Sequence, residues 1–297
     1  MSTRNTSISV DALQRAQIIS EALPYLRRWH GKTVVIKYGG AAMIEDNLKA
    51  AVMGDVALLH YVGIHPVVVH GGGREISDMC RQLGIEPKFV DGMRVTDPET
   101  MRVTEMVMGQ IGKNIAQLLH EKGAPAVGLS GKDGGLLRAH KYADEESGAD
   151  WGLVGEVDRV NVDVLHTLAR EGFVPVVTPV APGQQGETYN INADTAAGAI
   201  AAALGAAKLL LLTDVAGIYR DFEDKSSLID QLEACEAEAL IAQGVVSKGM
   251  IPKVRCCIDA VRGGVGRAHI VDGRAPHAIL TELFTDQGCG TMVVRDK

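Results

Sequence analysis

The sequence has 297 residues, of which 46% are hydrophobic and 23% charged, so it supplies a large core and is not a disordered chain. Its 30 basic and 37 acidic residues give a net charge of −7, and only 4% of the residues are aromatic. An acidic chain with no long basic run and few aromatic side chains is a poor binder of nucleic acid or of anionic membranes. The five cysteines lack a CxxC spacing, which favours free buried thiols over a zinc site or a disulfide framework.

The apolar stretches of the sequence predict neither export nor membrane insertion. The first residues contain no apolar signal segment, and the longest apolar stretch, 196–212, is interrupted by Lys208. We therefore expect a cytoplasmic protein without a membrane partner.

A helix is predicted before the first strand. Between residues 11 and 30, apolar residues recur at helical spacing, namely Leu13, Ala16, Ile19, Leu23 and Leu26. Pro24 predicts a kink or a break just before that residue, because proline cannot continue the backbone hydrogen bonding of a helix.

Short apolar runs alternate with helical patterns along the rest of the chain. Strands are predicted at 33–37, 66–70, 126–131, 174–177, 208–214, 269–271 and 291–294. Helices are predicted at 48–59, 76–83, 97–122, 162–170, 194–204, 228–243, 249–261 and 277–284, with hairpins in 136–160 around a polar tip at 144–150. Thr96 is the expected cap of its helix, because Pro98 and Glu99 follow it in the first turn.

This alternation predicts an α/β fold. Strands without polar alternation, separated by helices, are typical of a mostly parallel central sheet covered on both faces, a three-layer αβα sandwich. No linker rich in Pro, Gly or Ser divides the chain, so we expect two lobes that share one sheet.

Glycines follow two of the predicted strands. Gly39 and Gly40 come after the first strand, and the run 71–73 comes after the second and opens a helix. Ligands of open α/β sheets bind beyond the carboxyl ends of the strands, and glycine lets backbone N–H groups approach an anion. Three glycines in a row favour a phosphate or carboxylate site over a tight turn alone. The Walker A, Rossmann and protein-kinase glycine patterns are absent.

Four polar features are ambiguous when each is considered alone. Lys37 at a strand end points into a polar site or extends to solvent, and Lys253 early in a helix is functional or simply solvated. The segment 190–194 binds a ligand or caps the Ala-rich helix that follows, through Asn192 or Asp194. Arg94 reads as an ordinary surface arginine.

Six segments together resemble one family. KYGG, HGGGREI, GMRVTD, NINADTAAG, LLLLTDVAGIY and GMIPKV, in this order and spacing, resemble the amino-acid kinase superfamily and, within it, the arginine-sensitive acetylglutamate kinases. The resemblance covers about residues 33–294, and the sequence does not depart from the family pattern at the positions of the family's functional residues. It implies the amino-acid kinase fold and ATP-dependent phosphorylation of the γ-carboxylate of N-acetyl-L-glutamate in arginine biosynthesis. Mg²⁺ would be bound through the nucleotide phosphates, with no metal held by the protein.

The resemblance also implies roles for individual residues. Lys37 and Lys253 would stabilise the transferring phosphoryl group, and Asp194 would hold the two lysines in place. Substrate and phosphate oxygens would be bound by Gly72, Gly73, Arg94 and Asn190. The nucleotide would lie against Gly40, Thr213, Asp214, Gly217, Tyr219 and Lys253.

Regulation is implied by the same resemblance. In arginine-sensitive members an N-terminal helix interlaces dimers into a hexamer, and L-arginine inhibits from a site matched here by Tyr25, His269, Glu282 and Gly288. Some relatives also bind a PII-type signalling protein, and no residue here decides whether this chain does. The implied division is 1–30 for oligomerisation and regulation, 31–205 for acetylglutamate and 206–297 for ATP.

Other functions stay open at this point. Another kinase of the superfamily would act on aspartate, glutamate, carbamate or UMP. A non-catalytic arginine sensor with the same fold would lack turnover, although Lys37, Lys253 and Asp194 are all present. A nicotinamide-dependent dehydrogenase is disfavoured, because the Rossmann fingerprint is missing.

Overall fold

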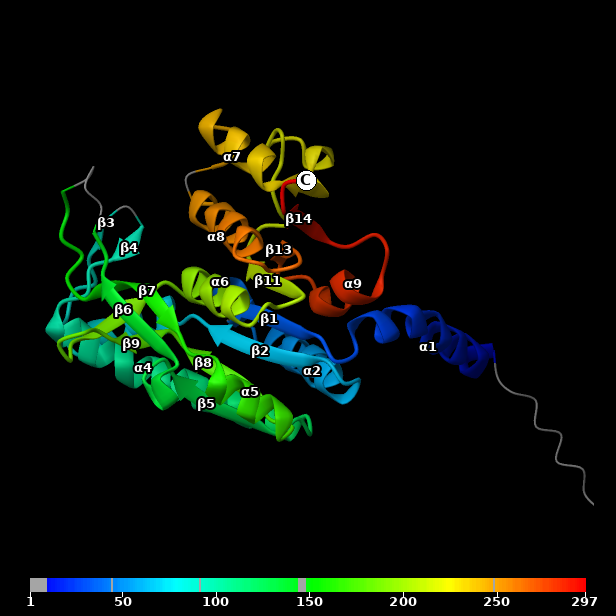
Figure 1. The fold of residues 1–297 in the computed structure, drawn as a ribbon, viewed down its shortest axis with the longest axis horizontal. Helices are drawn as coiled ribbons and strands as arrows, with labels where there is room; N and C mark the ends of the chain where they lie inside the picture. Colours follow the sequence, from blue (N-terminus) through cyan, green and yellow to red (C-terminus); the bar gives the residue numbers. More distant parts are fainter. Residues whose placement is uncertain (1–9, 44, 91, 144–147, 248) are drawn as a thin grey trace, which may run out of the picture.

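The computed structural model describes residues 10–43, 45–90, 92–143, 148–247 and 249–297. Its central sheet has eight strands (Figure 1), and neighbouring strands are parallel except for β13 and β14. The order across the sheet is β12 (Gln231–Glu233), β14 (Gly290–Val294), β13 (Ala268–Asp272), β11 (Lys208–Thr213), β1 (Thr33–Tyr38), β2 (His65–His70), β8 (Val174–Thr178) and β5 (Ala126–Ser130). The predicted mostly parallel sheet is therefore confirmed.

The two faces of this sheet enter two different cores. Val35 and Leu209, neighbours on β1 and β11, pack in one core, whereas Ile36 and Leu210 pack in the other. All four side chains are fully buried, because helices cover both faces. The first face is covered by α5 (Asp163–Arg170), α6 (Ala193–Ala203), α7 (Ala234–Ala242) and α8 (Ile251–Arg262). The second is covered by α2 (Asp46–Tyr61), α4 (Pro98–Glu121) and α9 (Ala278–Phe284), which completes the predicted sandwich.

The sheet combines two parts of the chain. The strands from 31–205 lie together on one side, and those from 206–297 lie together on the other, with β1 beside β11 at the join. A boundary between lobes near residue 205 stays a prediction. None of the described helices is long and apolar enough to cross a membrane.

A second sheet lies beside the first (Figure 1). It has the order β6 (Leu137–Lys141), β7 (Val154–Val160), β10 (Thr188–Ile191) and β9 (Val180–Pro182). The antiparallel pair β6–β7 confirms a hairpin in 136–160, although part of its predicted tip, 144–147, lies outside the described residues. The sequence analysis missed β9 and β10, since three or four residues are too few for a readable alternation.

Two predicted helix starts are wrong. The segment 231–233 is strand β12 rather than helix: Leu232 pairs with Val293 of β14, and α7 begins only at Ala234. Glu236 accepts a hydrogen bond from the Glu233 N–H at 2.8 Å, a helix-start signal that the sequence contained. For α4, the cap is Asp97, which accepts from Thr100 N at 2.7 Å.

The N-terminal helix, α1 (Val10–Trp29), projects from the rest of the molecule (Figure 1). It continues through Pro24, so the predicted break does not occur. Ser20, whose carbonyl loses its usual partner at Pro24, is exposed, and water can satisfy that carbonyl. The last turn of α1 is anchored to the body, where the buried Trp29 Nε1 donates to Leu283 O at 2.9 Å.

Replacing Asp97 by alanine is expected to lower the free energy of unfolding by about 1 kcal/mol, because the first turn of α4 loses its capping acceptor. Asp97→Asn keeps an acceptor and is the matched control. Urea unfolding at pH 7 measures both. Equal stability of Asp97→Ala and Asp97→Asn would contradict the assigned cap.

Candidate active site

The candidate site lies at the carboxyl ends of the central parallel strands. Lys37 is paired with Val69 of β2 and with Leu211 of β11, and each of these three strands ends within two residues of that row. The glycines after β1 and β2 therefore start at the same edge of the sheet. This edge is where the sequence predicted an anion site.

A buried carboxylate joins the two predicted lysines. Asp194 Oδ1 lies 3.1 Å from Lys37 Nζ, and Asp194 Oδ2 accepts from Lys253 Nζ at 2.7 Å. Burial alone would raise the pKa of Asp194, but the charges of Lys37 and Lys253 outweigh it and lower that pKa. The carboxylate is thus ionised, and it offsets the mutual repulsion of two ammonium groups. With two positive charges and one negative, the cluster attracts anions.

The local sequence explains the positions of these side chains. Asn192 caps α6 and accepts from the N–H groups of Asp194 and Thr195, which resolves the predicted choice of cap. Pro252 occupies the first turn of α8, a position where its missing N–H costs nothing, and Lys253 follows it. Asp194 and Lys253 therefore each lie in the first turn of a helix, where the backbone conformation is fixed.

Glycine suits two positions at this edge of the sheet, Gly40 after β1 and Gly72 in the anion loop, which is residues 71–73 after β2. Gly40 has a φ of +64°, a conformation that other residues rarely adopt. A Cβ on Gly72 would lie 2.6 Å from Met108 Sδ and from Ile111 Cδ1, so the loop rests directly on α4. Helix α3 (Gly73–Gln82) starts immediately afterwards, and its unpaired N-terminal N–H groups favour an anion.

A pocket of about 230 Å³ adjoins this loop and contains the predicted substrate residues Gly72, Gly73, Arg94 and Asn190. Arg94 lies in strand β4 (Met93–Arg94), which pairs with β3 (Phe89–Val90), and is only 8% exposed, so reading it as a surface arginine was wrong. Its Nη2 donates to Gly73 O and, at 2.8 Å, to Ser77 Oγ. Its buried Nη1 has no acceptor among the described residues, as expected of a group awaiting an anionic ligand.

The predicted nucleotide residues are more dispersed. Gly217 and Tyr219 line a narrow slot with the apolar side chains of Phe222, Val246 and Met250, which the sequence analysis missed. Their signal was weak, because single apolar residues in loops are common.

The other predicted nucleotide residues, Gly40, Thr213 and Asp214, do not line that slot. Thr213 ends β11, and its Oγ1 accepts from Val215 N at 3.0 Å, whereas Asp214 is exposed. Gly217 has a packing role as well, since a side chain there would collide with Thr291. Gly40 starts the short helix η1 (Gly40–Met43), which contacts β11.

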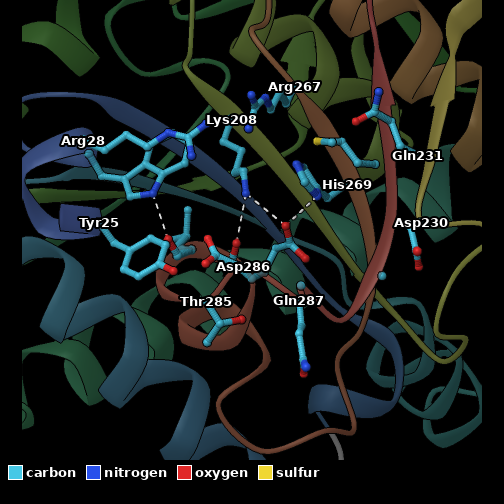
Figure 2. Close-up of a pocket in the computed structure, with 16 residues that line it drawn as sticks. Tyr25, Arg28, Lys208, Asp230, Gln231, Arg267, His269, Thr285, Asp286 and Gln287 are labelled. Atoms are coloured by element: carbon cyan, nitrogen blue, oxygen red, sulfur yellow. Dashed lines mark hydrogen bonds and ion pairs between the residues drawn. The ribbon is translucent and has the colours of Figure 1, made fainter. Parts of the chain in front are cut away.

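A second pocket of about 310 Å³ contains all four predicted regulatory residues, Tyr25, His269, Glu282 and Gly288. Figure 2 shows Lys208 and His269 extending toward its centre from neighbouring strands, with Tyr25 of α1 on the opposite side. Lys208 was read only as an interruption of an apolar stretch, and that interruption was the signal of a buried polar site.

Glu282 is the centre of this second pocket. Its Oε1 lies 3.0 Å from Lys208 Nζ and 2.8 Å from His269 Nδ1, and its Oε2 accepts from Cys289 N at 3.1 Å. Burial opposes ionisation, but the hydrogen bond from His269 and the charge of Lys208 lower the pKa of Glu282 to about 2. The carboxylate already has partners within the protein.

Comparisons with known proteins agree with this architecture. A sequence model of the amino acid kinase family matches residues 32–272. The chain therefore belongs to the amino acid kinase family.

Curated relatives narrow the assignment. Acetylglutamate kinase of Symbiobacterium thermophilum is 55% identical over 289 residues, covering 96% of this chain and 99% of that protein. Acetylglutamate kinase of Pelotomaculum thermopropionicum is 54% identical over 94% of this chain and 98% of that protein. Within the family, this chain thus groups with the acetylglutamate kinases.

Solved structures share the fold. An N-acetylglutamate synthase from Neisseria gonorrhoeae, complexed with coenzyme A and N-acetyl-glutamate, has a TM-score of 0.83 and 27% identity over 95% of this chain. The chain spans 64% of that longer protein. Carbamate kinase from Giardia lamblia, at a TM-score of 0.65 and 19% identity over 90% of this chain and 99% of that one, shares the fold alone.

The low pKa of Glu282 predicts a pH-dependent contribution to stability. In the folded protein the pKa of Glu282 is about 2, below its ordinary value of 4.5. The ionised carboxylate therefore stabilises the fold above pH 4.5, and this contribution is lost as the pH falls toward 2. Glu282→Gln should be clearly less stable than wild type at pH 7, with the difference shrinking below pH 4.5. Urea unfolding at pH 7 and pH 3 measures it, with Glu86→Gln at an exposed position as control. A difference that does not depend on pH would refute the assignment.

Proposed function

We propose that this protein transfers the γ-phosphoryl group of ATP to the γ-carboxylate of N-acetyl-L-glutamate. The observation that carries the proposal is the Lys37–Asp194–Lys253 cluster beside the glycine loop and the Arg94 pocket. The 54–55% identity to acetylglutamate kinases along nearly the whole chain supports this substrate over aspartate, glutamate, carbamate or UMP.

The chemistry needs positive charge rather than a base. The acceptor carboxylate is ionised at pH 7, so no proton has to be removed before it attacks. The barrier is the approach of two anions and the charge on the phosphoryl oxygens. Lys37 and Lys253 would neutralise that charge from two sides, while the N–H groups of Gly72 and Gly73 would donate to the oxygens.

Substrate and metal fit the remaining groups. A guanidinium forms charge-assisted hydrogen bonds with a carboxylate, so Arg94 Nη1, which has no acceptor in the described part of the chain, is suited to the α-carboxylate of the substrate, with Asn190 nearby. Each oxygen of Asp194 faces a lysine, which leaves Asp194 poorly placed to bind a metal. Mg²⁺ would instead be bound by the nucleotide phosphates, where it supplies further positive charge.

The lysine variants test this function. Lys37→Ala and Lys253→Ala should each lower kcat roughly 10²- to 10³-fold, the usual cost of losing one preorganised donor. Arg94→Ala should mainly raise KM for N-acetylglutamate, because it binds a group distant from the reacting carboxylate. Lys32→Ala, exposed just before β1, is the matched control.

A coupled assay of ADP release with N-acetylglutamate, aspartate, glutamate, carbamate and UMP gives all these constants. Wild-type kcat in either lysine variant would refute the mechanism. ATP binding without turnover on any of these substrates would instead favour a non-catalytic sensor.

We further propose that L-arginine inhibits the enzyme from the second pocket. The pocket offers acidic side chains, Asp230 and Asp286, to a guanidinium and basic ones, Arg28 and Arg267, to a carboxylate. Such mixed charge suits an amino acid with a cationic side chain. Because Glu282 is already paired, the guanidinium would have to compete with Lys208 and His269 for it.

The N-terminal helix supports a homo-oligomer, for which we propose a hexamer. Along α1, the large apolar residues Leu13, Ile18, Ile19 and Leu23 are all more than half exposed, an arrangement that favours a partner helix. Its last residues, including Tyr25, line the second pocket, so arginine binding and assembly would be coupled. The division into 1–30 for regulation, 31–205 for substrate and 206–297 for ATP is part of this proposal.

Deleting residues 1–28 should reduce a hexamer to dimers and weaken inhibition by arginine, which in wild type should be sigmoidal. Arginine can inhibit only if it binds the less active state of the enzyme more tightly than the active state. Removal of α1 deletes residues that line the arginine pocket, so binding should weaken. Light scattering and arginine titration measure the two effects. An unchanged mass, or full wild-type activity at millimolar arginine, would contradict the corresponding part of the proposal.

A further inference from the structure

The last residue of β2, His70, is fully buried and directly precedes the three glycines of the anion loop. Both ring nitrogens have partners: Nδ1 lies 2.9 Å from Gly71 O, and Nε2 lies 2.8 Å from Thr178 Oγ1 at the end of β8. A histidine held on both sides is fixed in position and in tautomer.

The partners determine which nitrogen carries the proton. Burial lowers the pKa of His70 to about 4, so the ring is neutral at pH 7 and has a single N–H. The carbonyl of Gly71 can only accept, which puts the proton on Nδ1. Nε2 then accepts from the Thr178 hydroxyl, for which the other acceptor, Met108 O, is more distant at 3.4 Å.

Packing keeps the ring in place. A Cβ on Gly112 of α4 would lie 3.0 Å from both His70 Nε2 and Thr178 Oγ1, so the helix backbone lies against this pair with no side chain between them. The ring has no room to rotate on that side.

The hydrogen bonds of Gly71 set the direction of the next peptide group. Gly71 N–H donates to Tyr38 O at 2.8 Å, while Gly71 O accepts from His70. In a trans peptide the C=O and the following N–H point in opposite directions, so the N–H of Gly72 points away from His70. Among the described residues this N–H donates to no protein acceptor, and Gly72 lines the Arg94 pocket.

We propose that His70, oriented by Thr178, is a positioning residue that keeps the Gly71–Gly72 peptide turned so that the Gly72 N–H faces the transferring phosphoryl group. Glycine peptides rotate easily, so a loop of three glycines needs such a restraint to be preorganised. The inference rests on the proposed kinase function. His70 itself touches neither substrate.

Thr178→Val tests the restraint with little change of shape. Without the hydroxyl, Nε2 is buried with no donor, and only the hydrogen bond from Nδ1 to Gly71 O still holds the ring. The orientation of the Gly71–Gly72 peptide is then less restrained. We expect kcat to fall roughly 10- to 100-fold, the usual loss when a residue that orients a functional group, without itself contacting the ligand, is replaced. The KM values for ATP and for N-acetylglutamate should change little. Thr178→Ser supplies the hydroxyl again and should recover kcat. Wild-type kcat in Thr178→Val, or an equal loss in Thr178→Ser, would overturn the proposal.

A second pair of variants separates hydrogen bonding from packing. His70→Asn keeps an amide N–H near the position of Nδ1, whereas His70→Leu keeps bulk but no donor. The expected order of kcat is wild type, then Asn, then Leu. A Leu variant as active as the Asn variant would overturn the positioning role.

The tautomer can be read without any turnover. Nitrogen NMR of the wild-type protein labelled at histidine distinguishes a protonated Nδ1 from a protonated Nε2. A protonated Nε2 in His70 would refute the proposal even if all variants fold poorly. Failure of the proposed function is a separate result, namely no wild-type turnover of ATP with N-acetylglutamate.

Discussion

The structure depends on one buried carboxylate, Asp194, placed between two lysines from different elements. Lys37 comes from β1 and Lys253 from α8, while Asp194 lies in the first turn of α6, so the three meet only if strand and helices are correctly packed. Cys256 Sγ donates to Asp194 O at 3.0 Å, and this is possible because Gly198 has no Cβ in its way. Close packing of α6 on α8 therefore sets the spacing of the charges that the chemistry needs.

One strand, β11, runs from the second pocket to the active-site edge of the sheet. β11 begins with Lys208, which pairs with Glu282 in the pocket of Figure 2, and ends with Thr213 beside the nucleotide slot. Its six residues are all buried, and it pairs with β1, whose second-to-last residue is Lys37. A ligand that disturbs Lys208 would thus act on the strand pair that positions the candidate active site. Coupling between the two sites requires only that the β1–β11 pair has two arrangements and that the ligand binds them with different affinities.

The sequence predicts the central sheet because each parallel strand is a continuous apolar run, and it predicts the anion loop because three glycines have few other uses. The burial of Arg94 could not be read, since it depends on the β3–β4 pair and on Ser77 and Gly73, which lie about twenty residues away in sequence. The strand at 231–233 was missed because its partner β14 lies some sixty residues later. Local patterns fail where a distant segment decides the conformation.

The candidate active site and the second pocket share one arrangement, a buried carboxylate between two basic groups. Burying such a trio gives little net stability, because desolvation offsets most of the attraction, and apolar residues of similar volume stabilise a core at least as well. Stability therefore does not account for either cluster. What a cluster provides is a fixed set of charges in a site of low polarity, where a charged ligand is bound far more strongly than in water. Both clusters, Lys37–Asp194–Lys253 and Lys208–Glu282–His269, therefore fit the ligands proposed above, a phosphoryl group at the first and an amino acid at the second.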